Sequence, residues 1–584
     1  MFSNQTALRC FRRNNFRIPY LGYYSVSHMA SKTVETNREL FEYTSGRWIY
    51  NESLRLPERA LVFSVRELKR VAAASIHRHE TDIKSFKKLA EGGFNRVFEI
   101  TMKDDGAKVL ARLPYPSTVP KRLTVASEVA TLDLIRSHDI PVPKVLDYST
   151  NPDNPVGAEY IIMEKIHGDP IGESWYTLSD KQRLKVLKGL VQLEAKLFAI
   201  DLPASGGLYY SHDLPPDVKG IIIRPSQDSD VTAGRGEICV GPVTSLKWWY
   251  GERRLLCNIN RGPHFDATES LTAIAEKELA WLQSYGKPRF PFERAYREAT
   301  NYRKSVPEEH MATLEKYLKI APYLVPKDKS LHRPILRHPD LQPNNIFVSK
   351  DLDIIGLIDW QYCSALPIFL AAGIPQYIQN YDDEESLHFI PPKLPKTLDE
   401  MGAHERSTAL EQFRRRHLHF YYLGFTQRFN PSHFHALDHD RSHLLKRKTF
   451  THAGDPWEGN NVQLKADLVH MVQNWDKVVT SADAEGGGGT DAVVPPCPIT
   501  FDLSEAQDTL RIEKEYEKID SQLSLIRDAI GVSIDGWTSN EMFEDAIARA
   551  KEFKKMAIDS VSDNKIDQEM TEKHWPFDDF VEDE

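Results

Sequence analysis

The fold is decided by the stretch His338-Pro339-Asp340-Leu341-Gln342-Pro343-Asn344-Asn345 and by Ile358-Asp359-Trp360 further along the chain. Asn345 follows Asp340 by five positions, and Asp359 follows it by nineteen. A carboxylate can orient the proton of an attacking hydroxyl, while an asparagine and a second aspartate offer oxygen ligands to Mg²⁺ beside nucleotide phosphates. The spacing D-x-x-x-x-N with a distant Asp is typical of a phosphoryl-transfer centre.

Two short apolar runs fill the interval between Asn345 and Asp359. They are Ile346-Phe347-Val348 and Ile354-Ile355-Gly356-Leu357-Ile358, and the polar stretch between them predicts a β-hairpin. Asn345 then lies at the start of one strand and Asp359 just past the end of the next, so their side chains come together. In the alternative interpretation, Asp340 and Asn345 form a capped turn and Asp359 caps a helix, because Asp and Asn favour such positions.

The pattern H-x-D-x-x-x-x-N followed by I-D-W resembles the aminoglycoside phosphotransferase and choline-kinase-like family, over residues 60–380 at motif level. Within that family, the length and the amino-terminal segment are most similar to the fungal altered inheritance of mitochondria protein 9 family. The resemblance implies an α+β, two-lobed, protein-kinase-like fold, with a small β-rich N-lobe and a larger, mainly helical C-lobe with insertions. It also implies ATP and Mg²⁺ as cofactors, with Asp340 as the base and with Asn345 and Asp359 as metal ligands.

The nucleotide-binding half begins with two predicted strands, residues 86–90 and 96–100, joined by a glycine-containing turn. Such a turn lets backbone N–H groups approach phosphates, so Gly92, Gly93 and Asn95 are candidate nucleotide-binding residues. Taken alone, a Gly-Gly hairpin is more often only a turn.

A third predicted strand, residues 109–113, carries Arg112, where the resemblance implies a cation that holds the nucleotide phosphates. The protein-kinase pattern has lysine there, and the planar fork of arginine is not a simple replacement for that point charge. Residues 123–138 have apolar positions at helical spacing, and the resemblance implies that Glu128 on this helix pairs with Arg112. The alternatives are a solvated Arg112 and an exposed helical Glu128.

The apolar run at residues 159–164 predicts a strand that ends at the boundary between the lobes. By resemblance, backbone groups around Met163 to Lys165 bind the adenine of the nucleotide. Gly168 then lets the chain turn into the larger lobe.

We expect five parts along the chain. They are a presequence at 1–34, the N-lobe at 35–165, the C-lobe with catalytic loop and substrate insert at 166–480, a flexible Gly/Pro-rich loop at 481–500, and a helical extension at 501–584. Helical spacing in the carboxyl-terminal half predicts helices at 408–422, 462–479, 504–530 and 540–561. The extension ends in an acidic tail with aromatic residues, which we expect to be solvated; docking on the protein's own surface or on a partner is the alternative.

Residues 1–34 contain five basic residues and no Asp or Glu. This composition is typical of a mitochondrial presequence and predicts a mitochondrial location, with a disordered basic tail as the alternative.

The net charge of −10 argues against nonspecific nucleic-acid binding. No run approaches the roughly 20 apolar residues of a transmembrane helix. The five cysteines lack C-x-x-C spacing and are expected to be reduced thiols.

The acceptor is not identified by the sequence. The insert at 170–335 contains Trp248-Trp249-Tyr250-Gly251-Glu252-Arg253-Arg254, which either lines a pocket for a cationic or sugar-like alcohol or, as we prefer, packs at a lobe junction. Histidines near residue 78 and at 433–443 lack zinc spacing and are expected to be surface or capping residues.

The leading hypothesis is a mitochondrial ATP-dependent phosphotransferase for a small-molecule hydroxyl. The alternative is a kinase-fold protein that binds ATP without turnover and regulates mitochondrial maintenance.

Overall fold

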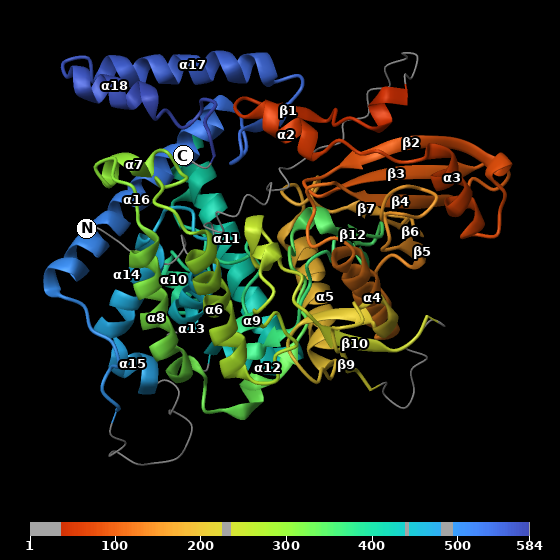
Figure 1. Ribbon diagram of the computed structural model, residues 1–584, viewed down its shortest axis with the longest axis horizontal. Helices are drawn as coiled ribbons and strands as arrows, with labels where there is room; N and C mark the ends of the chain where they lie inside the picture. The colour runs from red at the N-terminus through yellow and green to blue at the C-terminus, as the bar shows by residue number, and fades with distance from the viewer. Residues whose placement is uncertain (1–36, 225–234, 439–442, 481–493, 583–584) are drawn as a thin grey trace.

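The structure is a computed structural model that describes residues 37–224, 235–438, 443–480 and 494–582 of the chain. The predicted presequence and the glycine-rich part of the predicted loop lie outside these residues. Figure 1 shows a sheet-rich part beside a larger helical part. The two-lobed α+β fold that the sequence predicts is therefore confirmed.

An antiparallel sheet of five strands forms the smaller lobe, in the order β2-β3-β4-β6-β5. Its outer face packs Phe98, Ala111 and Ile162 against Leu68 of helix α3 (Val65–Ala74). The strands predicted at 86–90, 96–100, 109–113 and 159–164 are confirmed. The observed strands are β2 (Ile83–Glu91), β3 (Asn95–Met102), β4 (Lys108–Pro114), β5 (Val145–Ser149) and β6 (Tyr160–Glu164).

Helix α4 (Leu123–Ser137) is buried at every residue from Leu123 to Ile135. A helix that is enclosed on all sides belongs to the interior of a protein, which explains why apolar and small residues surround its axis. The helix predicted over 123–138 is confirmed. Glu128 is only 4% exposed, so the alternative of an exposed helical carboxylate is wrong.

The hairpin predicted between Asn345 and Asp359 is present. Strand β12 (Ile346–Val348) pairs antiparallel with β13 (Ile354–Leu357), and β7 (Asp169–Pro170) adds a third strand. Gly168 precedes β7 at a close approach, because a Cβ there would lie 2.5 Å from the Ile355 side chain and 2.8 Å from the Val348 carbonyl oxygen. Residue 168 must therefore lack a side chain for the backbone to enter the larger lobe along this path.

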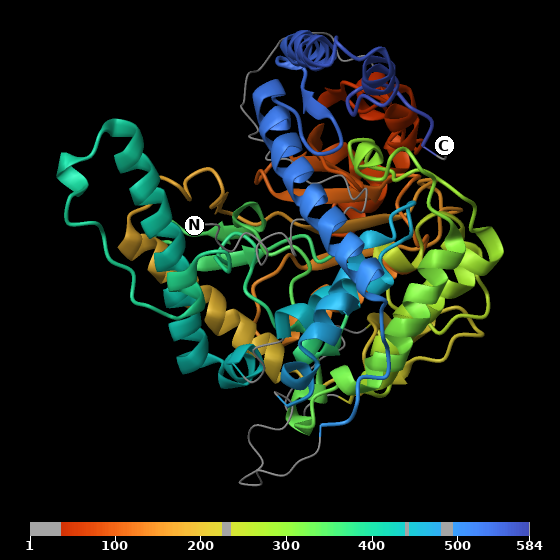
Figure 2. The same cartoon turned by 90° about the vertical axis from the view of Figure 1, so that its left-hand side faces the viewer.

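Helices dominate the larger lobe, and Figure 2 shows the pair α5–α11 on one side of it and the pair α6–α8 on the other. Helix α5 begins at a capping box in which Ser179 and Gln182 bond each other's backbone N–H groups. A three-stranded sheet in the insert, in the order β8-β10-β9, was not predicted. The helices and strands are α5 (Asp180–Ala199), β8 (Gly207–Tyr210), β9 (Ile221–Ile222), β10 (Ile238–Gly241), α6 (Ala267–Tyr285), α7 (Tyr296–Ala299), α8 (Pro307–Leu324), α11 (Ala403–Phe429), α12 (Pro431–Asp438) and α13 (His443–Gly454).

The helices predicted in the carboxyl-terminal half are present, with one correction. Residues 408–422 lie within α11, 504–530 form α16 (Leu503–Ile530), and 540–561 correspond to α17 (Phe543–Ser560). The predicted helix over 462–479 is instead two helices, α14 (Val462–Gln473) and α15 (Trp475–Thr480). Asn474 separates them, because its side-chain amide donates to the His470 carbonyl at 2.9 Å and competes with the helical bonding pattern.

The extension packs against both lobes. Strand β15 (Trp537–Ser539) pairs antiparallel with β1 (Gly46–Trp48), which leads into α2 (Glu52–Glu58), and Figure 1 shows α17 and α18 (Lys565–Lys573) at the same edge of the molecule as β1. Trp575 and Phe577 are 8% and 5% exposed. The Asn51 N–H donates to Asp579, and Arg55 pairs with Glu582. The expectation of a solvated tail is therefore wrong for these residues, because aromatic side chains anchor the tail while its carboxylates find partners.

No helix in the described part of the chain combines the length and the apolar character needed to cross a membrane.

Candidate active site

His338 connects the two halves of the predicted catalytic motif. Its Nδ1 accepts from the Asp340 N–H at 3.1 Å, so Nε2 carries the proton and donates to the Ile358 carbonyl at 2.8 Å. Burial lowers the pKa of His338 to about 4, which keeps this ring neutral. The ring packs on Trp360 with centroids 4.6 Å apart. His338 thus fixes the backbone before Asp359 to the loop that carries Asp340.

Asn345 is held by the same unit. Its carbonyl accepts from the Ile358 N–H at 3.0 Å, and its side-chain Nδ2 donates to the Asp340 carbonyl at 2.8 Å. In the described part of the chain, no group donates to the Asn345 Oδ1. The amide is therefore oriented by its nitrogen, and its oxygen is left to bind something else.

Asp359 has a left-handed backbone conformation with φ +66°, which is uncommon outside glycine. Its Oδ1 accepts from Arg112 Nη2 at 2.7 Å. Arg112 also pairs with Glu128 and donates to Gln361 at 2.8 Å. The expected pair of Arg112 and Glu128 is thus present, and Arg112 is not a solvated strand residue.

Three carboxylates lie at this site, and among the described residues Arg112 contacts two of them. Arg112 contacts both Glu128 and Asp359, while Asp340 accepts from Gln342 at 2.6 Å. Burial raises the pKa of Glu128 to about 7, more than the nearby Arg112 lowers it. Asp340 keeps contact with solvent, yet the protein packed around it and the charge of Asp359 raise its pKa to about 6. The site is therefore short of positive charge, and a divalent cation beside Asp359 would correct this.

The glycine turn reaches this centre through the residues that follow it. The Gly92 N–H donates to the Asn95 carbonyl at 2.9 Å and closes the turn. The side-chain amide of Asn95 donates to Gln361 Oε1 at 2.5 Å, and the same oxygen accepts from Arg112 Nη2. Neither Gly92 nor Gly93 has a positive φ, so the backbone conformation does not require glycine at these positions.

Comparisons with known proteins identify the family of the chain. A family model described as "Phosphotransferase enzyme family" matches residues 85–369. A "subtelomeric hrmA-associated cluster protein" of Aspergillus fumigatus is 30% identical over 526 residues, which are 84% of this chain and 96% of that protein. The chain belongs to the phosphotransferase enzyme family. The resemblance stated from the sequence motifs is confirmed.

Two other similarities of this phosphotransferase-family member are more distant. "Altered inheritance of mitochondria protein 9, mitochondrial" of Yarrowia lipolytica is 26% identical over 371 residues, covering 59% of this chain and 62% of that one. An aminoglycoside phosphotransferase solved with ADP bound is 12% identical over 77% of this chain and 97% of its own, with a TM-score of 0.32. A TM-score this low supports no structural conclusion.

The predicted adenine-binding segment lies at the end of β6. Met163 is inside the sheet, paired with Leu110 on one side and Val145 on the other, and the Glu164 N–H donates to the Lys144 carbonyl at 3.0 Å. The segment that links the lobes therefore begins only at Lys165.

Lys165 belongs to a cluster that the sequence analysis missed. It pairs with Glu99 of β3, which also lies 3.2 Å from the Lys87 ammonium and 3.4 Å from that of Lys108. Although burial opposes it, the hydrogen bonds from Lys165 and Lys87 lower the pKa of Glu99 to about 2. Lys87 and Glu99 are direct cross-strand partners, and this was the one signal of the cluster in the sequence. Using that signal requires the register of the hairpin.

The aromatic and charged run of the insert divides between a core and a cavity. Trp248 and Arg253 are buried, and Arg253 donates to Glu278 at 2.8 Å while its guanidinium lies 4.0 Å from the Trp281 ring centroid. The preferred interpretation, core packing, is confirmed for these residues. Tyr250 and Arg254 instead line a cavity.

The histidine patches have structural partners where they are described. His79 accepts from the Thr81 N–H at a helix start, and His435 pairs with Asp328 at 2.7 Å. Within the described residues, no three His, Cys, Asp or Glu side chains are grouped as metal ligands. A Mg²⁺ site here would therefore take few protein ligands, as is usual when phosphates complete the coordination.

Proposed function

We propose that this protein is an ATP- and Mg²⁺-dependent phosphotransferase that acts on a hydroxyl group of a small molecule. The observation that carries the proposal is the convergence of Asp340, Asn345 and Asp359. The His338–Ile358 and Ile358–Asn345 hydrogen bonds hold the loop and the hairpin in one unit. Membership of the phosphotransferase family supports the reaction class.

The residues present fit a nucleotide-bound Mg²⁺. Asn345 Oδ1 makes no hydrogen bond within the described part of the chain, and Asp359 uses only Oδ1. Asn345 Oδ1 and the other carboxylate oxygen of Asp359, Oδ2, would hold the metal. When bound, the metal would neutralise the phosphate charge. Asp340 would take the proton of the acceptor hydroxyl, and a pKa of about 6 leaves it ionised yet basic near neutral pH.

Arg112 would position the site and contact phosphate. Its guanidinium already donates to Asp359 and pairs with Glu128, so it fixes the rotamer of the proposed metal ligand. Its planar fork presents several N–H groups, which allows it to keep one of these partners while donating to a phosphate oxygen.

Thermal unfolding of the full chain, with and without ATP and Mg²⁺, tests the site. A ligand at a hundred times its dissociation constant stabilises the folded state by about 2.7 kcal/mol, so the shift should be visible. We expect a metal-dependent shift in wild type and in Asp351→Ala, an exposed aspartate of the same hairpin, but none in Asp359→Ala. Equal shifts in all three proteins, or none in wild type, would refute the proposal.

The second candidate, ATP binding without turnover, is favoured by one observation. Arg112 stands where the protein-kinase pattern has lysine, and it is hydrogen-bonded directly to Asp359. If this candidate is correct, wild type will show the Mg²⁺-ATP shift but will consume no ATP with any acceptor, and Arg112→Lys will not gain activity. Turnover by wild type excludes this candidate.

We also propose that the protein is mitochondrial. The basic composition of residues 1–34 and the name of the Yarrowia lipolytica relative, a mitochondrial protein, support this location. A reporter fused to residues 1–34 should be imported, and deletion of these residues should leave the full protein cytosolic. Persistent import of the deletion variant would contradict the prediction that residues 1–34 are a mitochondrial presequence.

A further inference from the structure

The segment that carries the proposed metal ligand Asp359 makes several contacts with the smaller lobe. Trp360 is 0% exposed and anchors the segment in the core, while the Tyr362 hydroxyl donates to the Val119 carbonyl of the smaller lobe at 3.1 Å. Asp359 and Tyr362 both have a left-handed backbone with φ +66°. Outside glycine this conformation is costly and persists where the surrounding contacts determine it. The contacts of this segment therefore hold it in a conformation that it would not otherwise adopt.

Gln361 joins two groups of the smaller lobe at one atom. Its Oε1 accepts from the Asn95 side-chain amide at 2.5 Å and from Arg112 Nη2 at 2.8 Å. Gln361 is 5% exposed, and a hydrogen bond away from water is electrostatically stronger than one in water. Gln361 thus connects the segment of Asp359 both to the glycine turn and to the strand that carries Arg112.

The two donors depend on Gln361 to different degrees. Arg112 also pairs with Glu128 and donates to Asp359, so two carboxylates orient its guanidinium without Gln361. In the described part of the chain, the Asn95 amide donates to no other group. Loss of Gln361 would therefore leave Arg112 oriented but release Asn95, and with it the glycine turn.

A second contact joins the same segment to the same turn. The Phe94 ring meets the Tyr362 ring edge-on, with centroids 5.2 Å apart. The Phe94 carbonyl is held by its own lobe, because it accepts from the Tyr115 N–H at 2.8 Å and from the Thr118 hydroxyl at 2.6 Å. Contacts within the smaller lobe thus fix the turn relative to the sheet, whereas Gln361 and Tyr362 fix it relative to the larger lobe.

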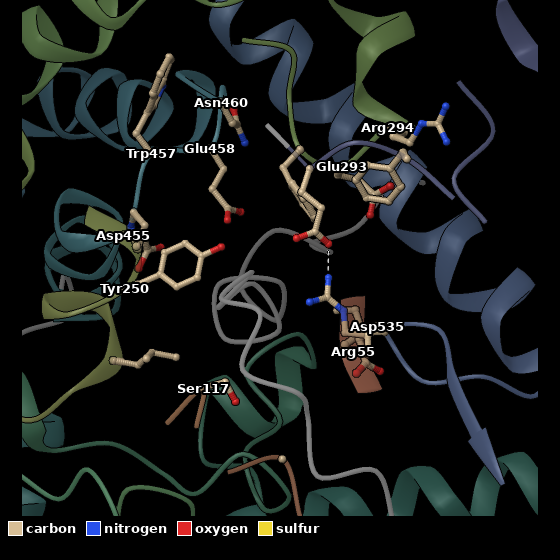
Figure 3. A pocket seen from close by; sticks show the side chains of 18 of the residues that line it. Arg55, Ser117, Tyr250, Glu293, Arg294, Asp455, Trp457, Glu458, Asn460 and Asp535 are labelled. Atoms are coloured by element: carbon tan, nitrogen blue, oxygen red, sulfur yellow. Dashed lines mark hydrogen bonds and ion pairs between the residues drawn. The ribbon is translucent and has the colours of Figure 1, made fainter. Parts of the chain in front are cut away.

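On another side, the turn borders open space. Gly93 and Phe94 line a cavity of about 410 Å³, to which the larger lobe also contributes. Figure 3 shows other side chains of its wall, among them Ser117, Tyr250 and Asp455. Packing between described residues does not join the turn to the larger lobe across this space. The contacts from Gln361 and Tyr362 are therefore needed to hold the turn in place between the lobes.

The turn offers backbone donors beside Asn95. In the described part of the chain, the N–H groups of Gly93 and Phe94 make no hydrogen bond. Neighbouring free N–H groups attract anions such as phosphates. We propose that Gln361 is a positioning residue for phosphate binding, which acts through Asn95 to hold these two N–H groups in place relative to Asp359. This inference rests on the proposed function, because it takes the ligand to be a nucleotide.

The contribution of Gln361 should depend on the phosphates of the ligand. Adenosine has the base and the ribose of ATP but no phosphate, so a displaced turn should not change its affinity. We expect Gln361→Leu to weaken the binding of Mg²⁺-ATP about tenfold, as the loss of one hydrogen bond predicts, and to leave adenosine binding unchanged. Calorimetry measures the first affinity and an NMR titration the second, both on the full chain.

Two further variants and a control accompany Gln361→Leu. Asn95→Ala removes the same hydrogen bond from the other side and should cause the same loss. The double variant should bind no more weakly than either single variant, because both remove one interaction. Gln379→Leu is the matched control, since Gln379 is 6% exposed and its Oε1 has no partner among the described residues. It should bind both ligands as wild type does.

Hydrogen exchange reports on the turn without any nucleotide. The Gly92 N–H donates to the Asn95 carbonyl at 2.9 Å and is protected by this bond. It should exchange faster in Gln361→Leu and in Asn95→Ala than in wild type, and at the wild-type rate in Gln379→Leu. Thermal unfolding confirms that each variant is folded, and Asn95→Ala remains informative if Gln361→Leu does not fold.

Three results would overturn the proposal. Equal weakening of ATP and adenosine binding would show that Gln361 has a structural role only. Additive losses in the double variant would show that Gln361 and Asn95 act separately, and unchanged ATP affinity in both single variants would exclude positioning. Failure of wild type to bind Mg²⁺-ATP would instead refute the proposed function, so the two failures are distinguishable.

Discussion

Asp340 must be ionised to accept a proton, so its raised pKa determines where activity falls with pH. Because the pKa is raised to about 6, the ionised form is lost as the pH falls below that value. We expect the rate of phosphoryl transfer to be constant above about pH 7 and to fall roughly tenfold per pH unit below about pH 5. A rate that stays constant down to about pH 4.5 in a folded wild type would exclude Asp340 as the base.

Replacing the carboxylate separates its chemical role from a structural one. Asp340→Asn should abolish transfer while the Mg²⁺-ATP-dependent thermal shift is retained, because the metal ligands are other residues. Asp351→Asn, on the exposed turn of the same hairpin, should keep both. Undiminished turnover by Asp340→Asn would remove this residue from the mechanism.

Glu128 gives a prediction about stability. Its pKa is about 7 in the folded protein and near 4.5 in the unfolded chain, so the stability it contributes is present at low pH and is lost as the pH rises toward 7. Glu128→Gln should therefore raise the unfolding temperature relative to wild type at pH 8 and have little effect at about pH 4. Thermal scans at both pH values check this. A strongly lowered unfolding temperature at pH 8 would show that the ion pair with Arg112 outweighs burial.

At this scale, ordered spacing indicated Asp340, Asn345 and Asp359 as candidate site residues, whereas the Arg112–Glu128 pair was expected from the family resemblance. The partners of Glu99 were missed, since lysines from β2, from β4 and from the segment after β6 meet it only in the folded protein.

At the scale of elements, the approach of β7 to the hairpin depends on Gly168. A Cβ there would lie 2.5 Å from Ile355 and 2.8 Å from the Val348 carbonyl, and the backbone oxygen cannot move aside easily. We expect Gly168→Ala to destabilise the protein by about 1–3 kcal/mol, seen as a lower unfolding temperature.

The control for this change is Gly424→Ala in the interior of α11, where a Cβ would meet nothing within 4 Å. That substitution should stabilise the helix by about 0.5–1 kcal/mol, because alanine loses less backbone entropy than glycine. If both substitutions had the same sign of effect, the close approach at Gly168 would not be limiting.

Most elements were predictable because their apolar periodicity extends over many residues. Helix α16 is an example, since it ends as expected where Gly531 adopts a left-handed φ of +86°. The break at Asn474 was missed because the apolar spacing continues across it. Strands β1 and β15 have three residues each and are separated by most of the chain, so no local pattern predicts their pairing.

At the scale of the whole molecule, the extension connects regions that the sequence analysis treated as separate. Arg294 of the larger lobe donates to the Trp575 carbonyl at 2.8 Å, and the Phe580 N–H donates to Asn51 near the smaller lobe at 2.9 Å. The acidic composition of the tail suggested solvation, and the decisive partners, Arg55 and Arg294, are remote in sequence. Composition alone therefore did not reveal that the tail contacts both the larger lobe and the segment near the smaller lobe.

The tail is tested by removing its aromatic anchor. Trp575 is 8% exposed and its ring lies 5.9 Å from that of Phe577, so Trp575→Ala should create a cavity and lower the free energy of unfolding by about 3–5 kcal/mol. Phe265→Ala, at a phenylalanine that is 70% exposed, is the control and should change it little. If docking restrains the lobes, limited proteolysis of Trp575→Ala will also cut near residues 46–59 faster than in wild type. Unchanged stability and unchanged proteolysis would mean that the tail rests on the surface without holding it.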